Sequence, residues 1–167
     1  MVDTDMGETY NRQDIEKLFY EIRDKSFHDY CSRCRLKFGH RKMRGYSSPF
    51  DGNVHINLRL IANMGKDALI GLLAHELGHQ VSYKKRRIVK RFIFLRNYYN
   101  NLEKRRIVEK EADMIAIERG YAQELLEDRK IQQAAYVNYP KRLEEVKKTY
   151  LTYDELKGYI GRDSTAQ

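Results

Sequence analysis

The spacing of apolar residues divides the chain into two parts. Near the N-terminus, four apolar residues recur at helical spacing and predict an amphipathic helix over residues 8–27: Ile15, Leu18, Phe19 and Ile22. Glycine, serine and proline then interrupt the pattern, and the apolar residues between them fit short strands. We place these strands at residues 36–40, 42–46 and 53–58, the last of which alternates between apolar and polar side chains.

After Gly65 the helical spacing continues almost to the end of the chain. It predicts helices over residues 67–83, 87–99, 103–119 and 121–136, followed by one or two short helices from Pro140 to about Ile160. Gly120 is a natural C-cap for the third of these helices, and residues 161–167 are expected to be a frayed tail. This order predicts an α+β fold that is mainly helical, with a small antiparallel sheet.

Length and composition fit one globular domain over residues 1–167. Within it we expect a helix and sheet part (8–62), a part with metal-binding helices (63–120) and a C-terminal helical part (121–167). Apolar residues make up 41% of the chain and charged residues 34%, and the net charge of +8 favours acidic partners. No apolar run approaches the roughly 20 residues of a membrane span, and the N-terminus lacks a signal-peptide pattern, so a cytoplasmic location is expected.

Two histidines lie four residues apart in the first long helix, in the segment His75-Glu76-Leu77-Gly78-His79. This spacing places both imidazoles on one helix face, roughly 6 Å apart along the axis. Two imidazoles so placed can bind one zinc ion, and Glu76 can take a proton from zinc-bound water. The five-residue pattern also arises by chance, but the apolar residues before it are typical of a buried helix.

A catalytic zinc ion usually has three protein ligands and one open position. Four acidic residues on the predicted helix over 103–119 could supply the third ligand: Glu109, Glu111, Asp113 and Glu118. Glu109 and Asp113 share a face with two alanines, whose small side chains would let the two helices pack closely. We therefore expect Glu109 to bind the metal, and Asp113 to accept a hydrogen bond from a zinc-bound histidine such as His75. The alternative is an ordinary charged helix face.

The segments 71–79 and 109–116 resemble the gluzincin metallopeptidases, and the HtpX and CAAX-prenyl-protease type most closely. In that family the first glutamate of the second segment binds zinc and the aspartate four residues later supports it, roles that fall here on Glu109 and Asp113. The resemblance covers about residues 53–120 and implies a zincin-like fold. It departs from that type in lacking membrane helices, so the small soluble minigluzincins, some made as latent proteins, are more similar. The ImmA/IrrE-type regulatory peptidases are the second choice.

The resemblance also implies a substrate-binding strand. In such peptidases the strand before the active-site helix is the edge of the sheet and binds the substrate backbone antiparallel. This role would fall on residues of the strand over 53–58, namely Val54, His55, Ile56 and Asn57. An edge strand has unpaired backbone N–H and C=O groups that an extended peptide can bond. The alternative is an ordinary packed strand, and both can hold at once.

The predicted activity is zinc-dependent hydrolysis of peptide bonds in a protein or peptide substrate. Zinc would polarise the carbonyl and activate the water, and Glu76 would take the proton and pass it to the leaving amine. A further donor must stabilise the oxyanion, and four candidates stay open: Tyr98, Arg106, Tyr136 and Tyr139. The C-terminal part carries no catalytic motif and either completes the core or covers the cleft, as latency would require.

A second metal site is also possible in principle, because Cys31 and Cys34 are spaced C-x-x-C and flanked by His28 and His40. These four side chains could hold a structural zinc ion. A lone C-x-x-C is a weak signal, and two thiols without metal are the alternative. A redox dithiol is less favoured, because no βαβ pattern follows.

Residues 84–91 form a basic run that could bind nucleic acid or anionic lipid. A solvated helix end is the commoner reason for such a run and is the favoured interpretation. Two alternatives to an active peptidase therefore remain. One is a catalytically silent or latent zinc-binding regulatory protein, and the other is a DNA-associated peptidase or nucleic-acid-binding protein. The sequence leaves the oligomeric state open.

Overall fold

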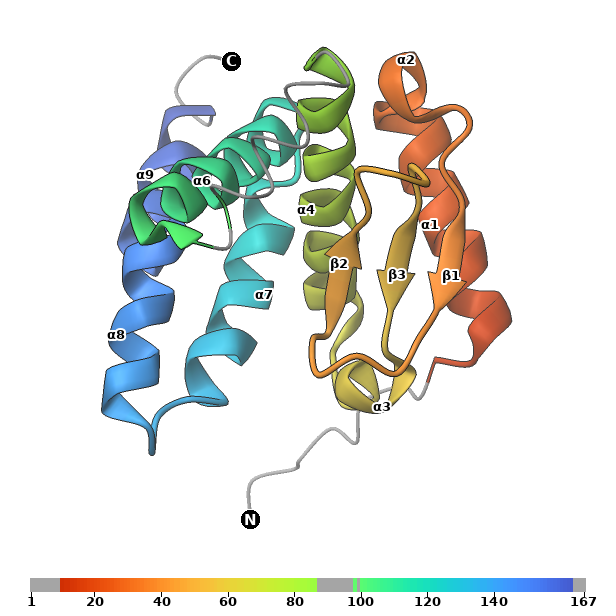
Figure 1. Ribbon diagram of the computed structural model, residues 1–167. Coiled ribbons are helices and arrows are strands. Elements are labelled where there is room, and N and C mark those ends of the chain that lie inside the picture. Colours follow the sequence, from red (N-terminus) through yellow and green to blue (C-terminus); the bar gives the residue numbers. More distant parts are fainter. Residues whose placement is uncertain (1–9, 87–97, 99, 164–167) are drawn as a thin grey trace.

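A computed structural model describes residues 10–86, 98 and 100–163 (Figure 1). Its helices are α1 (Arg12–Ser26), α2 (His28–Cys31), α3 (Leu58–Ile61), α4 (Lys66–Lys85), α6 (Leu102–Glu118), α7 (Ala122–Ala134), α8 (Pro140–Thr149) and α9 (Tyr153–Asp163). Its strands are β1 (Leu36–Phe38), β2 (Gly45–Ser47) and β3 (Val54–Ile56). The predicted α+β, mainly helical fold is confirmed. The predicted helix over 87–99 lies almost wholly outside the described residues.

The sheet differs from the prediction in its topology. Its strand order is β1-β3-β2, with β2 and β3 antiparallel but β1 and β3 parallel, so the sheet is mixed. The chain leaves β1, forms the hairpin of β2 and β3, and returns through β3 between the other two strands. The prediction that residues 53–58 form an edge strand was therefore wrong: β3 is the central strand, and β2 is the edge beside α4 (Figure 1).

The outer side of β2 has backbone groups that do not bond β3. The amide of Ser48 donates to Asn53, and the amide of Asn57 donates to Arg44, each at 2.9 Å. Because bonding alternates along an antiparallel strand, the N–H and C=O groups of Gly45 and Ser47 point away from β3. β2 therefore has the edge geometry that was expected of β3.

Helix α4 is the centre of the molecule and is buried on nearly all sides. The sheet and α1 pack on one side of it, and α6 and α7 pack on the other (Figure 1). Two glycines make this close packing possible. A Cβ on Gly78 would lie 2.5 Å from the carbonyl oxygen of Ala112 in α6, and one on Gly71 would lie 2.2 Å from that of Glu124 in α7. The main chains of α4 and α6 thus approach each other closely at Gly78 and Ala112.

Local signals explain the remaining helix ends. Asn11 and Asp14 form a capping box that starts α1, whose predicted apolar face is buried. Gly120 has a φ of 90° and follows the end of α6, as the C-cap prediction required. Pro140 interrupts the helical pattern and also begins α8. At the first position of a helix the backbone N–H has no partner within the helix, so proline loses no hydrogen bond there. Among the described helices, none is long and apolar enough to cross a bilayer.

Candidate metal centre

Helices α4 and α6 bring together three potential metal ligands: His75, His79 and Glu109. Their ligand atoms all lie within 4.8 Å of one another, and all three residues are buried. One oxygen of Glu109 lies 3.2 Å from Nε2 of His75 and 3.3 Å from Nε2 of His79. Two atoms bound to one tetrahedral zinc ion at about 2.05 Å lie roughly 3.3 Å apart. The distances from Glu109 to the two imidazoles therefore suit such an ion, and the three predicted ligands lie together.

The contacts of His75 show why a cation fits between these groups. Its Nδ1 lies 2.7 Å from an oxygen of Asp113 and, when it carries a proton, donates to that carboxylate. In the neutral ring, Nε2 then has only a lone pair, and it faces the Glu109 carboxylate. A lone pair and a carboxylate oxygen repel each other unless a proton or a metal ion lies between them. Asp113 thus orients His75 as predicted and leaves Nε2 available as a ligand.

The electrostatics of the cluster favour positive charge at its centre. Burial lowers the pKa of His75, but Asp113 and Glu109 outweigh burial and raise the pKa to about 10. Burial raises the pKa of Glu109, yet His79 and His75 hold that pKa well below its usual value. Both shifts come from the same pairing of imidazoles with carboxylates. A divalent cation bound there would meet carboxylates that are already ionised.

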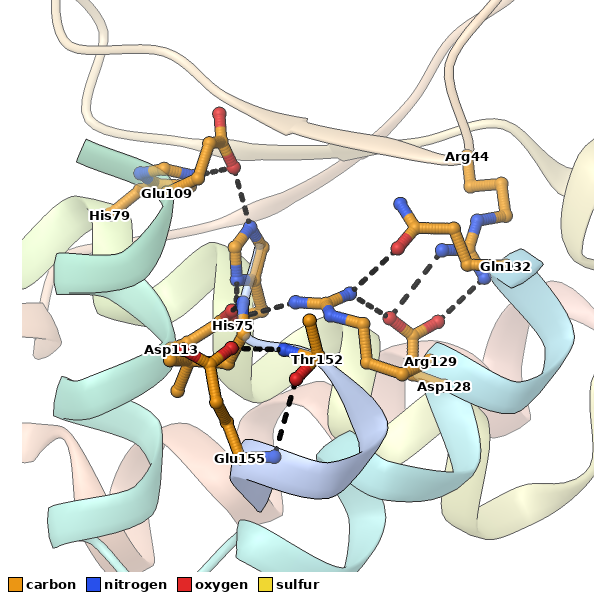
Figure 2. A network of polar contacts seen from close by, with 11 residues as sticks. Arg44, His75, His79, Glu109, Asp113, Asp128, Arg129, Gln132, Thr152 and Glu155 are labelled. Atoms are coloured by element: carbon orange, nitrogen blue, oxygen red, sulfur yellow. Dashed lines mark hydrogen bonds and ion pairs between the residues drawn. The ribbon is translucent and has the colours of Figure 1, made fainter. Parts of the chain in front are cut away.

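A buried chain of ion pairs lies beside His75 and reaches it through Asp113 (Figure 2). Arg129, which is 2% exposed, donates to Asp113 at 2.5 Å and to Asp128 at 2.8 Å. Asp128 also accepts a hydrogen bond from Arg44 at 2.6 Å, and Asp113 accepts one from the backbone N–H of Leu151 at 3.0 Å. Burial raises the pKa of Asp113, but Arg129 and His75 keep it below its usual value. The orientation of His75 therefore depends on the contacts that Asp113 receives from Arg129 in α7 and from the backbone of Leu151.

Glu76 lies beside the ligands but is not one of them. It is buried, its Oε2 has no hydrogen-bond partner, and burial raises its pKa. The edge strand β2 covers it closely: the Ser47 hydroxyl donates to the Glu76 carbonyl oxygen at 2.5 Å. A Cβ on Gly45 would lie 3.0 Å from Oε1 of Glu76 and 3.0 Å from Cδ1 of Ile56. Glycine at position 45 thus leaves room for the Glu76 carboxylate.

Replacing Gly45 should therefore displace the Glu76 carboxylate as well as press on the core residue Ile56. We expect Gly45→Ala to lower the turnover of any reaction that uses Glu76 by about tenfold, since small misplacements of a catalytic group are costly. The matched control is Gly39→Ala, because a Cβ at Gly39 would meet nothing within 4 Å. Steady-state kinetics and thermal unfolding of both variants test this. Equal turnover in both variants would contradict the predicted role of Gly45.

Two clefts adjoin at Glu76. The metal cleft, of about 360 Å³, is lined by the three ligands, by β2 and the residues after it, and by Tyr83, Tyr98 and Tyr150. The arginine cleft, of about 350 Å³, is lined by Arg44, Arg105, Arg129 and Arg142 and by apolar residues of α4, α7 and α8. Both clefts include Met43, Gly45, His75, Glu76, Arg105 and Tyr150 in their walls. A ligand lying along β2 would pass from one cleft to the other across Glu76.

The four candidate oxyanion donors differ in their position relative to the two clefts. Tyr98 lines the metal cleft and its hydroxyl donates to Glu109, and Tyr136 lines the arginine cleft. Tyr139 is 65% exposed, and Arg106 pairs with Glu103, so neither belongs to the two clefts. Glu111, another of the four acidic candidates for the third ligand, pairs with Arg86 at 2.5 Å instead.

The strand residues expected to bind substrate have other contacts. Val54 and Ile56 belong to the hydrophobic core, and the ring of His55 stacks on Tyr46 with centroids 4.4 Å apart. Asn57 caps α3 by accepting a hydrogen bond from the N–H of Arg59. The edge position expected for this strand from the resemblance was wrong, and the alternation of its residues could not correct it, because alternation shows which face of a strand is buried and not which strands lie beside it.

The structure does not assemble the predicted second zinc site. Cys31 and Cys34 are fully buried and free, whereas His28 and His40 are exposed, and His28 faces Asp24 at 3.8 Å. Within the described part of the chain, only the cluster of His75 has three potential ligands together. The hydrogen bond from Cys31 lowers the pKa of Cys34 to about 7 against the effect of burial, and Lys84 assists it at 3.7 Å.

Sequence reasoning missed Arg44, Arg105, Asp128, Arg129 and Tyr150. One signal was available for Arg129, because it lies four residues after Leu125 and so shares the buried face of α7. A charged residue on an apolar helix face needs a buried partner. Tyr150 lies after the end of α8, where periodicity carries no information.

The chain was compared with protein-family models, with curated proteins and with solved structures, and none of the three comparisons gave a match. The site consists of a buried group of two imidazoles and a carboxylate that could hold a metal ion. A buried glutamate and two clefts lie beside this group.

Proposed function

We propose that this protein is a zinc-dependent peptidase of the gluzincin kind. One observation carries the proposal: the buried ligand cluster lies next to a buried glutamate whose second oxygen has no partner, and both face open clefts. A structural zinc site is closed by its ligands and needs neither a nearby free carboxylate nor a cleft. Two imidazoles and one carboxylate are also the ligand set of several zinc peptidases.

Zinc held by His75, His79 and Glu109 would supply the Lewis acidity that polarises a peptide carbonyl and activates a water molecule. Glu76, whose Oε2 has no hydrogen-bond partner, would take the proton of that water and deliver it to the leaving amine. Asp113 keeps His75 in the orientation that a ligand needs, with Arg129 behind it. Burial of all these groups excludes bulk water and so strengthens each electrostatic interaction.

The peptide itself would bind along β2 rather than β3. Gly45 and Ser47 present their backbone groups at the outer edge of the sheet, and both residues line the metal cleft. An extended peptide can pair with such an edge and is then held antiparallel or parallel to it by backbone hydrogen bonds. The proposed substrate-binding strand is therefore β2, the neighbour of β3 in the sheet, and not β3 itself.

Removal and return of zinc test the proposal. A mixture of unstructured peptides should be cleaved by the zinc-loaded protein, remain intact after chelation, and be cleaved again when zinc is restored. Mass spectrometry identifies the cleaved bonds, and elemental analysis gives the zinc content of each sample. A protein that binds zinc but cleaves none of the peptides would favour the zinc-binding regulatory alternative.

A further inference from the structure

The arginine cleft has an excess of positive charge. Its walls hold four arginines but only two carboxylates besides Glu76, those of Asp128 and Glu145. Asp128 accepts from Arg44 and Arg129, and Glu145 accepts from Arg105 through one oxygen and from Arg142 through the other. Each of the two carboxylates is thus shared between two guanidinium groups. Arg129 is also paired with Asp113, but in the described part of the chain the other three arginines have only Asp128 and Glu145 between them, so the cleft can accept a further anion.

Arg105 is the arginine best placed to bind that anion. It lines both clefts, as Glu76 does, and so lies where the two clefts meet. Its contact with Glu145 is long, at 3.4 Å, and its Nε is buried without a hydrogen-bond partner. A guanidinium group has five N–H donors, and a buried donor without a partner is costly. Arg105 therefore has donor capacity that the protein itself does not use.

We propose that Arg105 binds a carboxylate of the substrate, one that enters the arginine cleft next to the bond that is cut. This rests on the proposed peptidase function and gives it a substrate class. A planar guanidinium binds a carboxylate through two parallel hydrogen bonds, and the Arg105 side chain is 28% exposed in the wall of both clefts. Leu72 and Val146 also line this cleft and would contact the aliphatic part of the same residue.

The carboxylate can come from two sources. In an endopeptidase it belongs to an Asp or Glu side chain near the cut bond. In a carboxypeptidase it is the free C-terminus of the substrate. Both sources present the same planar anion to Arg105, so the geometry of the cleft does not distinguish them. The peptide probes must therefore vary the acidic side chain and the free C-terminus independently.

Binding to a chain without turnover separates this proposal from the peptidase proposal. The zinc-loaded Glu76→Gln protein is mixed with fluorescent peptides of alanine and leucine that carry one Glu or one Gln at each position in turn. Each peptide is made with a free and with an amidated C-terminus. Fluorescence anisotropy should show tighter binding of the Glu peptides or of the free C-termini. Equal binding of all four kinds would overturn the proposal.

Variants then assign the preference to Arg105. In the same background, Arg105→Gln should weaken binding of the preferred peptide by at least about tenfold, as expected for a charge-assisted pair, and leave the neutral peptide unchanged. Arg105→Lys keeps the charge but loses the two parallel N–H donors of the guanidinium group, so its affinity for the preferred peptide should lie between those of the protein with Arg105 and the Arg105→Gln protein. Arg106→Gln is the matched control, because it removes the same charge one residue away, where the side chain pairs with Glu103. An equal loss in the Arg105→Gln and Arg106→Gln proteins would mean a general charge effect and would overturn the proposal.

The two proposals can fail separately. Cleavage of peptides by the unmodified protein without any preference for a carboxylate would contradict the role of Arg105 alone. A clear carboxylate preference in binding, with no cleavage by the zinc-loaded unmodified protein, would contradict the peptidase function and leave the anion site in place.

Discussion

The Glu76→Gln protein should bind zinc as tightly as the unmodified chain and lose nearly all peptide cleavage. Glutamine keeps the shape of the side chain but cannot accept a proton, so we expect kcat/KM to fall by about 100- to 10,000-fold. The zinc content should not change, because the carboxylate of Glu76 is not among the three grouped ligands. Elemental analysis and steady-state kinetics on the same preparation measure both quantities.

The stability of this variant gives a second readout. Glu76 is a buried carboxyl group with one oxygen that makes no hydrogen bond. Replacing it by a neutral amide removes the cost of burying a charge, so the thermal midpoint should not fall. Glu111→Gln is the control, since Glu111 pairs with Arg86 near the surface and should change neither zinc content nor cleavage. Undiminished cleavage by the Glu76→Gln protein would refute its role as the base.

Arg129→Met should cause the largest loss of stability among the variants considered. It removes the buried cation that Asp113 and Asp128 share, and both carboxylates are almost fully buried. Breaking a buried ion pair by removing one partner costs about 3–5 kcal/mol. For a chain of this size that corresponds to a fall in Tm of roughly 6–20 °C.

Chemical denaturation of the zinc-free protein measures this loss without a contribution from metal binding. The matched control is Arg142→Met, because Arg142 lines the same cleft but its ion pair with Glu145 is half exposed. Such a pair contributes at most about 1 kcal/mol, so this variant should remain close to the unmodified protein. If the two variants lost equal stability, the buried network would not be the stabilising element that its burial indicates.

The metal ligands could be predicted because each rests on a local rule. The four-residue spacing of His75 and His79 fixes both on one helix face, and small residues beside Glu109 mark the side on which two helices meet. The place of β3 in the sheet rests on no such rule. Three-residue strands carry too few side chains to specify their neighbours, and the parallel pairing with β1 depends on the path of the intervening hairpin.

The network behind the site shows a different limit. Arg129 meets Asp113 from sixteen residues away and Arg44 meets Asp128 from eighty-four residues away. Charged residues on helices are usually solvated, so the local sequence shows at most that Arg129 lies on a buried helix face and does not show which residues it pairs with. Cys31 and Cys34 illustrate the converse, because their spacing is typical of metal ligands while their burial makes them part of the hydrophobic core.

The backbone contact at Gly78 has a consequence for the choice of metal. Since the main chains of α4 and α6 meet there with no side chain in between, the helix that carries the two histidines is packed directly against the helix that carries Glu109. A rigid set of three ligands accommodates ions of one size and coordination number. Large cations that need six to eight oxygen ligands, such as Ca²⁺, should be rejected by this geometry, so discrimination between ions would be a property of the helix crossing as much as of the ligands.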